Sequence, residues 1–240
     1  MSVAAPTQPT PARLDGLKTY FSVLFSPAAA FERLSRVPTW GWAAIIGIAL
    51  TLVAMVLIAP AQLHMTAVMQ NERVSQMPAD QQAQARAVMA SATAVTKVAI
   101  YIVTFIIPWF AWIVSAVVFL IAAALGGGEV KFAKAWVAAV NGYVIYGIAS
   151  IVNATIVRMR DPNSVNSPTD IMSLPSLGLF VHGNPKLAAF FFTYNVLYIW
   201  SYVIAVIALE RMMKVSRTAA IVTVVIYSLL WALIGMLSAR

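Results

Sequence analysis

The apolar stretch "WGWAAIIGIALTLVAMVLIAPAQL", residues 40–63, determines the fold class of this chain. It contains no charged residue and is apolar on every face, so a helix of this sequence has no polar side to present to water. About 20 such residues are enough to cross the hydrocarbon core of a bilayer. Trp40 and Trp42 stand at its start, where indole rings favour the membrane–water interface. The stretch predicts a transmembrane helix.

Four later segments have the same character. They predict further spans at residues 98–125, 134–157, 187–209 and 218–237. Pro108 is predicted to kink the second span, and the triple glycine at 126–128 to end it. The composition agrees, since 61% of the 240 residues are hydrophobic and 10% are charged, with a mean hydropathy of +0.84. We predict an all-α, polytopic membrane helical bundle with five transmembrane helices, occupying residues 39–240.

Residues 14–38 precede the first span and have the pattern of two short amphipathic helices. In "LFSPAAAFERLSRVP", residues 24–38, Ser26 can cap a helix whose first residue is Pro27. Phe31 and Leu34 then share one face of that helix. Residues 1–13 are rich in Pro, Thr and Ala without periodicity, which predicts a disordered tail.

Two placements of this juxtamembrane segment are open. It can lie in the interface with its basic residues at anionic headgroups, or it can pack beneath the bundle. We predict contact with the membrane surface or a partner for a set of residues near the N-terminal side of the bundle: Phe25, Pro27, Phe31, Arg33, Leu34, Arg36, Lys131, Lys134, Lys214 and Arg217.

The two long connections differ in kind. Residues 64–97 are polar and helix-prone, so we expect them to extend the second helix into water, with Asp80 as its N-cap. Residues 158–186 are rich in proline and glycine, which predicts an irregular loop. Within it, "IMSLPSLGLF" at 171–180 is too short to span and too apolar for water, so it should lie in the interface or dip back into the protein.

The distribution of Lys and Arg predicts the orientation. Nine of them fall on the N-terminal side of a five-span layout and seven on the other, and the nine lie in shorter loops next to span ends. We predict a multi-pass protein of the cytoplasmic (inner) membrane, and the positive-inside rule predicts that its N-terminus is cytoplasmic and its C-terminus outside. The net charge of +8 lies in short clusters beside spans, with no nucleic-acid-binding groove or motif, so we expect no nucleic-acid partner.

Few residues are of the types that carry chemistry. None of the eight carboxylates falls in the middle of a span, which argues against a proton-coupled pump. Cysteine is absent, and His64 and His182 have no metal-ligand spacing with each other or with an acidic residue. We predict no catalytic residue, no metal site, no cofactor and no enzymatic activity.

The predicted third and fourth spans carry polar side chains. The candidate polar cluster within the membrane is Asn141, Tyr143, Tyr146, Asn153, Asn195 and Tyr198. An amide in hydrocarbon is costly unless it is hydrogen-bonded, so these groups should face protein or a polar cleft. They can join helices together, or they can line a groove for a lipid headgroup or a partner helix. Small residues along the first span indicate close helix packing, within one chain or in a homodimer.

Three stretches, in order and spacing, resemble the Yip1-domain family. They are "LFSPAAAFERLSRVPTWGWA", "LGGGEVKFAKAWVAAVNGYVIYGI" and "YNVLYIWSYVIAVIALERMMKVSRTAAIVTVVIYSLL", and the third is most similar to bacterial members. The resemblance implies a five-helix membrane fold without enzymatic activity. This chain lacks the Pro that many members have after the Gly142–Tyr143 pair, and it has Asn195 where bacterial members often have Asp.

Two functions are consistent with these features. The first is a non-enzymatic membrane protein that organises or scaffolds assemblies of membrane proteins and lipids. The alternative is a transport protein, either an accessory subunit of a multicomponent exporter or a lipid-moving protein that uses the polar faces of the third and fourth spans. The expected partners are membrane lipids, anionic headgroups among them, and other membrane proteins. "KFAKAWV" and "KVSRTAAIV" also suggest an internal repeat, or simply two short cytoplasmic turns.

Overall fold

The structure is a computed structural model that describes residues 15–238, apart from the side chains of residues 90–97 and 238. The tail predicted for residues 1–13 lies outside the described residues. Within the described range the protein is all-α. Its helices are α1 (Asp15–Phe25), α2 (Pro27–Arg36), α3 (Gly41–Ser75), α4 (Ala79–Leu125), α5 (Phe132–Gly142), α6 (Val144–Arg158), α7 (Pro185–Phe192), α8 (Val196–Met212) and α9 (Arg217–Ser238), with 3-10 turns η1 (Pro162–Ser164) and η2 (Leu177–Phe180).

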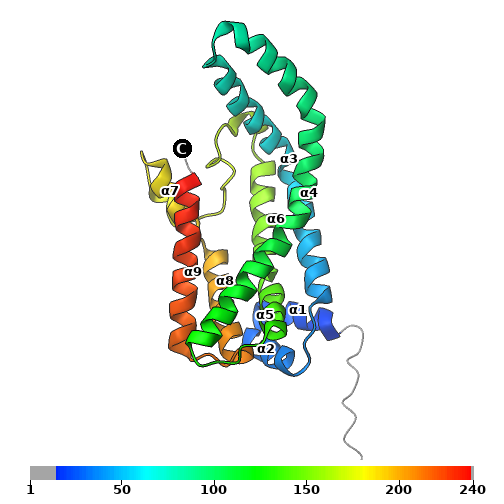
Figure 1. Ribbon diagram of the computed structural model, residues 1–240, viewed down its shortest axis with the longest axis vertical. Helices are drawn as coiled ribbons and strands as arrows, with labels where there is room; N and C mark the ends of the chain where they lie inside the picture. The colour runs from blue at the N-terminus through cyan, green and yellow to red at the C-terminus, as the bar shows by residue number, and fades with distance from the viewer. Residues whose placement is uncertain (1–14, 239–240) are drawn as a thin grey trace, which may run out of the picture.

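The long helices run roughly along one axis. Figure 1 shows α3, α4, the α5–α6 pair, α8 and α9 in this direction, with α1 and α2 together at the lower end. The described chain ends at the top of α9, away from α1 and α2 (Figure 1). Four stretches are long and apolar enough to cross a membrane: Gly41–Ser75, Val98–Leu125, Phe132–Arg158 and Arg217–Leu237. The prediction of four of the five spans is therefore confirmed by length and composition.

The predicted continuous helix at residues 187–209 is wrong. The structure has two helices there, α7 and α8, separated at residues 193–195. The side chain of Asn195 accepts a hydrogen bond from the Tyr198 amide at 3.0 Å and so caps α8. The carbonyl of Tyr194 accepts instead from the amide of Leu177, 3.2 Å away in the preceding loop. A contact from a distant part of the chain thus ends the helix that the apolar pattern would continue.

The remaining helices differ from the prediction in their ends. Helix α4 does extend the second span far from the bundle, as expected, but the residue before it is Pro78 and Asp80 lies in its first turn, so the cap assigned to Asp80 is wrong. The third span is interrupted at Tyr143, which ends α5 and begins α6. The interruption occurs without a proline, next to Gly142, which is a weak helix former.

The N-terminal helices belong to the main core. Helix α2 packs against α8, and α1 packs against α2 and α3. Phe31 and Leu34 are buried in this contact, together with Tyr20 and Val23 of α1. Of the two placements left open by the sequence, the structure therefore shows this face packed beneath the bundle.

Small residues on the first span also face inward. Ala44 and Ala54 of α3 are buried, and a side chain added at Gly47 would contact Trp112 at 3.5 Å. This arrangement lets α3 approach α4 and α6 closely. The stripe of small residues is thus used for packing within one chain.

Candidate functional site

A cavity of about 360 Å³ lies within the bundle. Residues of α3, α4, α6, α7, α8 and α9 line it, and Ile171, Met172 and Leu174 of the α6–α7 connection contribute to its wall. We call it the intramembrane cavity. Five residues of the predicted polar cluster line it: Tyr143, Tyr146, Asn153, Asn195 and Tyr198. The structure therefore brings together residues that lie more than fifty positions apart in the sequence.

Three tyrosines join α6 to α8 at this cavity. The rings of Tyr143 and Tyr146 have centroids 4.7 Å apart, and Tyr146 stacks on Tyr198 with centroids 5.5 Å apart and an interplanar angle of 5°. Each tyrosine combines an apolar ring with a polar hydroxyl. The lining also includes apolar side chains, among them Met55 and Ile107. The lining is therefore amphipathic.

The three asparagines of the predicted cluster have structural partners. Asn141 lies outside the cavity and is buried, and its side-chain amide donates to the carbonyls of Thr39 and Val137, each at 2.9 Å. Asn195 caps α8. Asn153 holds the α6–α7 connection, since it donates to the carbonyl of Ile171 at 3.0 Å and accepts from the amide of Ser173 at 2.8 Å. The cluster thus both joins segments and lines a cleft.

Residues 171–180 fold back onto the helices. Leu174 and Ser176 are buried, and η2 packs against α7. Leu177, Leu179 and Phe180 are exposed, so one part of this apolar stretch dips back into the protein and its other part remains on the surface.

Replacing Asn153 by leucine should detach this connection from α6. Both hydrogen bonds are lost and two backbone groups are left without their partner, which should cost about 2 kcal/mol of unfolding free energy. We expect faster proteolysis within residues 166–181 in detergent, measured by mass spectrometry of the fragments. Asn166→Leu is the control, because its side-chain bond joins only neighbouring residues of the loop. Equal protection in the Asn153 and Asn166 variants would contradict this role.

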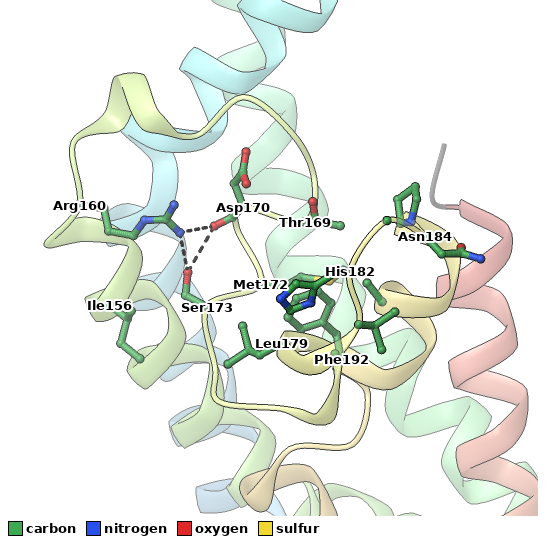
Figure 2. A pocket seen from close by; sticks show the side chains of 15 residues that line it. Ile156, Arg160, Thr169, Asp170, Met172, Ser173, Leu179, His182, Asn184 and Phe192 are labelled. Atoms are coloured by element: carbon green, nitrogen blue, oxygen red, sulfur yellow. Dashed lines mark hydrogen bonds between the residues drawn. The ribbon is translucent and has the colours of Figure 1, made fainter.

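A second pocket of about 680 Å³ lies beside the α6–α7 connection. We call it the outer pocket. Figure 2 shows Arg160, Asp170, Ser173 and His182 around it, with apolar side chains such as Leu179 below. Arg160 donates to the main-chain carbonyl of Asp170 at 2.8 Å and to the hydroxyl of Ser173 at 3.2 Å.

The carboxylate of Asp170 is engaged by the loop itself. It accepts from the backbone amides of Asn166 at 3.0 Å and Ser167 at 2.8 Å. Burial alone would raise the pKa of Asp170, but the hydrogen bonds from Ser167 and Asn166 and the charge of Arg160 outweigh it and lower the pKa. The pocket is therefore lined by two charged side chains, the Arg160 guanidinium and the ionised Asp170 carboxylate, whose Oδ2 is bonded to the loop backbone.

The residues predicted to meet the membrane or a partner divide into two groups. Pro27, Phe31 and Leu34 are buried within the protein, so they contact neither lipid nor a partner in this conformation. Phe25 is 85% exposed on α1. The basic residues lie at the same end of the bundle, and all are exposed except the partly buried Lys134; we call this group the basic face: Arg33, Arg36, Lys131, Lys134, Lys214 and Arg217.

Acidic residues balance part of the basic face. Glu129 pairs with Lys134 at 2.7 Å and lies 3.6 Å from Lys131. The hydrogen bond and charge of Lys134 hold the pKa of Glu129 below its usual range, with a smaller contribution from Lys131. Arg36 pairs with Glu32 at 2.6 Å. These pairs are exposed and contribute little to stability.

Sequence reasoning assigned no site to Arg160 or Met172. Arg160 lines the outer pocket, and Met172 lines both cavities. The feature of the sequence that could have pointed to these residues is the high density of proline and apolar residues in the α6–α7 connection. Among the described residues, no three His, Asp or Glu side chains gather as a metal site would need.

The fold and its cavity define an all-α, multi-pass membrane protein with a polar cleft among its helices. Comparison with protein families matches the Yip1 domain to residues 21–239. The chain therefore belongs to the Yip1 domain family, whose members are generally non-enzymatic proteins of membrane trafficking. No curated protein and no solved structure matches it.

Proposed function

We propose that this protein is a non-enzymatic organiser of membrane protein and lipid assemblies, and that it acts through its basic face. The observation that carries the proposal is a positively charged end of the bundle whose helices are packed onto the core. Helices α1 and α2 are fixed there by Phe31 and Leu34, while Arg33 and Lys214 point outward. Neither Arg33 nor Lys214 has an ion-pair partner among the described residues. Such cations attract anionic headgroups by about 1 kcal/mol each.

The proposed orientation in the membrane is based on the same basic face. The basic face is cytoplasmic, α8 completes a fifth crossing, and the C-terminus is outside. Helix α8 has 17 residues, or about 26 Å at a rise of ~1.5 Å per residue, and α7 and the α6–α7 connection fill the remaining depth. A reporter fused after Arg240 should be active outside the cytoplasm. A cytoplasmic reporter would refute this orientation.

The test of the proposal compares two double variants. Arg33→Gln with Lys214→Gln removes charge from the basic face, and Arg86→Gln with Arg158→Gln removes the same charge elsewhere. After purification in mild detergent, retained anionic phospholipid should fall by about thirtyfold in the first variant alone. Membrane proteins that co-purify with the native chain should be lost in the same variant. Unchanged lipid and no reproducible membrane partner would reject the proposal.

The intramembrane cavity favours a second candidate, a lipid-moving protein. Its amphipathic lining offers polar groups to a headgroup at membrane depth. Reconstitution into liposomes tests it, since the protein alone should equilibrate a labelled phospholipid between leaflets faster than protein-free liposomes do. Asn141→Leu and Asn195→Leu are unsuitable variants for this assay, because both side chains hold the fold. Equal rates with and without protein would exclude this candidate.

A further inference from the structure

We propose that the intramembrane cavity and the outer pocket form one binding site for a phospholipid with an anionic headgroup. One acyl chain occupies the cavity, and the phosphate binds at Arg160. The inference deepens the second candidate function but requires only binding at equilibrium, not movement between leaflets.

The two cavities are neighbours. Met172 of the α6–α7 connection and Phe192 of α7 line both of them. The outer pocket is rich in polar groups, whereas the wall of the inner cavity includes Ala54, Met55 and Ile58 of α3. A polar compartment next to an amphipathic one matches the two parts of a lipid. The inner volume of about 360 Å³ also falls within the ~300–1,000 Å³ of small-molecule sites.

Arg160 provides the recognition of an anion. Only one nitrogen of its guanidinium, Nη1, is bonded, to the carbonyl of Asp170 and the hydroxyl of Ser173. The other nitrogens have no partner among the described residues. Those two bonds hold the side chain across the pocket (Figure 2). A guanidinium fixed in this way presents its remaining donors to a phosphate in a planar arrangement.

The acyl chain of the lipid can enter the intramembrane cavity between α4 and α9. These helices converge toward the end that carries α1 and α2 (Figure 1). Ser115 of α4 and Tyr227, midway along α9, are joined at 3.2 Å. Farther from that end, Thr104 of α4 and Gly235 of α9 both line the intramembrane cavity. The cavity thus lies where the two helices have separated. One acyl chain can insert there while the other remains in the bilayer.

Two matched pairs of variants test the site. Thr104→Phe fills the cavity, whereas Val103→Phe places the same ring on the neighbouring position, which is 50% exposed. Arg160→Gln removes the anchoring charge, and Arg158→Gln removes a charge from an exposed position on the same helix end. Arg160→Lys keeps the charge without the planar set of donors, so it separates a general charge effect from phosphate recognition.

The probe is a phosphatidylglycerol with a photoreactive group in one acyl chain. It is mixed into phosphatidylcholine vesicles that contain the protein. Cross-links are mapped by mass spectrometry. We expect them at cavity residues such as Met55, Ile107 and Met172, reduced about tenfold by Thr104→Phe and Arg160→Gln and unchanged by the two controls. Excess inorganic phosphate should not displace the probe, because its acyl chain in the cavity also holds it.

Three results would overturn the inference. The first is cross-linking confined to exposed faces of α4 and α9 and insensitive to Thr104→Phe. The second is displacement of the probe by phosphate alone, which would indicate a free-phosphate site. The third is equal labelling by a phosphatidylcholine probe in all Arg160 variants. A protein that binds the probe but fails to move lipid in liposomes would exclude the lipid-moving function and leave this site intact.

Discussion

Replacing Gly128 by alanine is expected to destabilise the folded protein by about 3 kcal/mol. A Cβ atom at this position would clash with the main-chain oxygen of Met213 and lie 2.9 Å from Cγ2 of Val215. Backbone atoms cannot move aside as a flexible side chain can. The α4–α5 turn and the α8–α9 turn would therefore have to move apart. This movement would break the hydrogen bond that the amide of Glu129 donates to the carbonyl of Met213 at 2.6 Å. The triple glycine thus brings the α4–α5 turn against the α8–α9 turn.

The measurement is thermal unfolding in detergent, followed by tryptophan fluorescence. Gly41→Ala is the matched control, because nothing lies within 4 Å of a Cβ built there. Gly127 adds an independent check. Its φ of +70° is in the left-handed region, so Gly127→Asn should be tolerated better than Gly127→Val. A Gly128→Ala protein as stable as Gly41→Ala would show that the two turns are not in tight contact.

The same contact explains what sequence reasoning could and could not predict. A triple glycine after an apolar run indicates the end of a helix, and the structure confirms that α4 ends at Leu125. The pattern does not reveal that Gly126 and Gly128 also make room for Val215, because that neighbour comes from a turn more than eighty residues later. Local propensity predicts where a helix stops, whereas close approach depends on the tertiary fold.

In the fourth apolar segment, the sequence predicted a continuous helix that the structure does not have. Residues 187–209 satisfy the composition of a span, but the break at Asn195 depends on the hydrogen bond between Leu177 and Tyr194. Polar residues within spans were a better guide, because amides and hydroxyls in an apolar region need partners or a cleft. Five of the six predicted polar residues therefore line one cavity. The outer pocket could not be predicted, since Arg160 and Asp170 meet only through the path of an irregular loop.

Replacing Phe31 by alanine is expected to lower the free energy of unfolding by about 3–5 kcal/mol, the range for truncating a buried phenylalanine. The ring is fully buried in the contact between α2 and α8, together with Leu34. Its loss would leave a cavity at the point where α1 and α2 join the bundle. Because α2 contributes only this one face to the core, we expect local undocking of α1 and α2 before the bundle itself unfolds.

Limited proteolysis of the reconstituted protein separates local from global effects. Phe31→Ala should speed cleavage within residues 15–38 while the fragments from 41 onward stay protected. Phe25→Ala is the control, because Phe25 is 85% exposed and its truncation removes no core contact. The basic face depends on this docking, since Arg33 and Arg36 are carried by α2. Phe31→Ala should therefore lower retained anionic phospholipid with every charge still present. If docking is lost and lipid retention is unchanged, a docked basic face is not what binds the membrane surface.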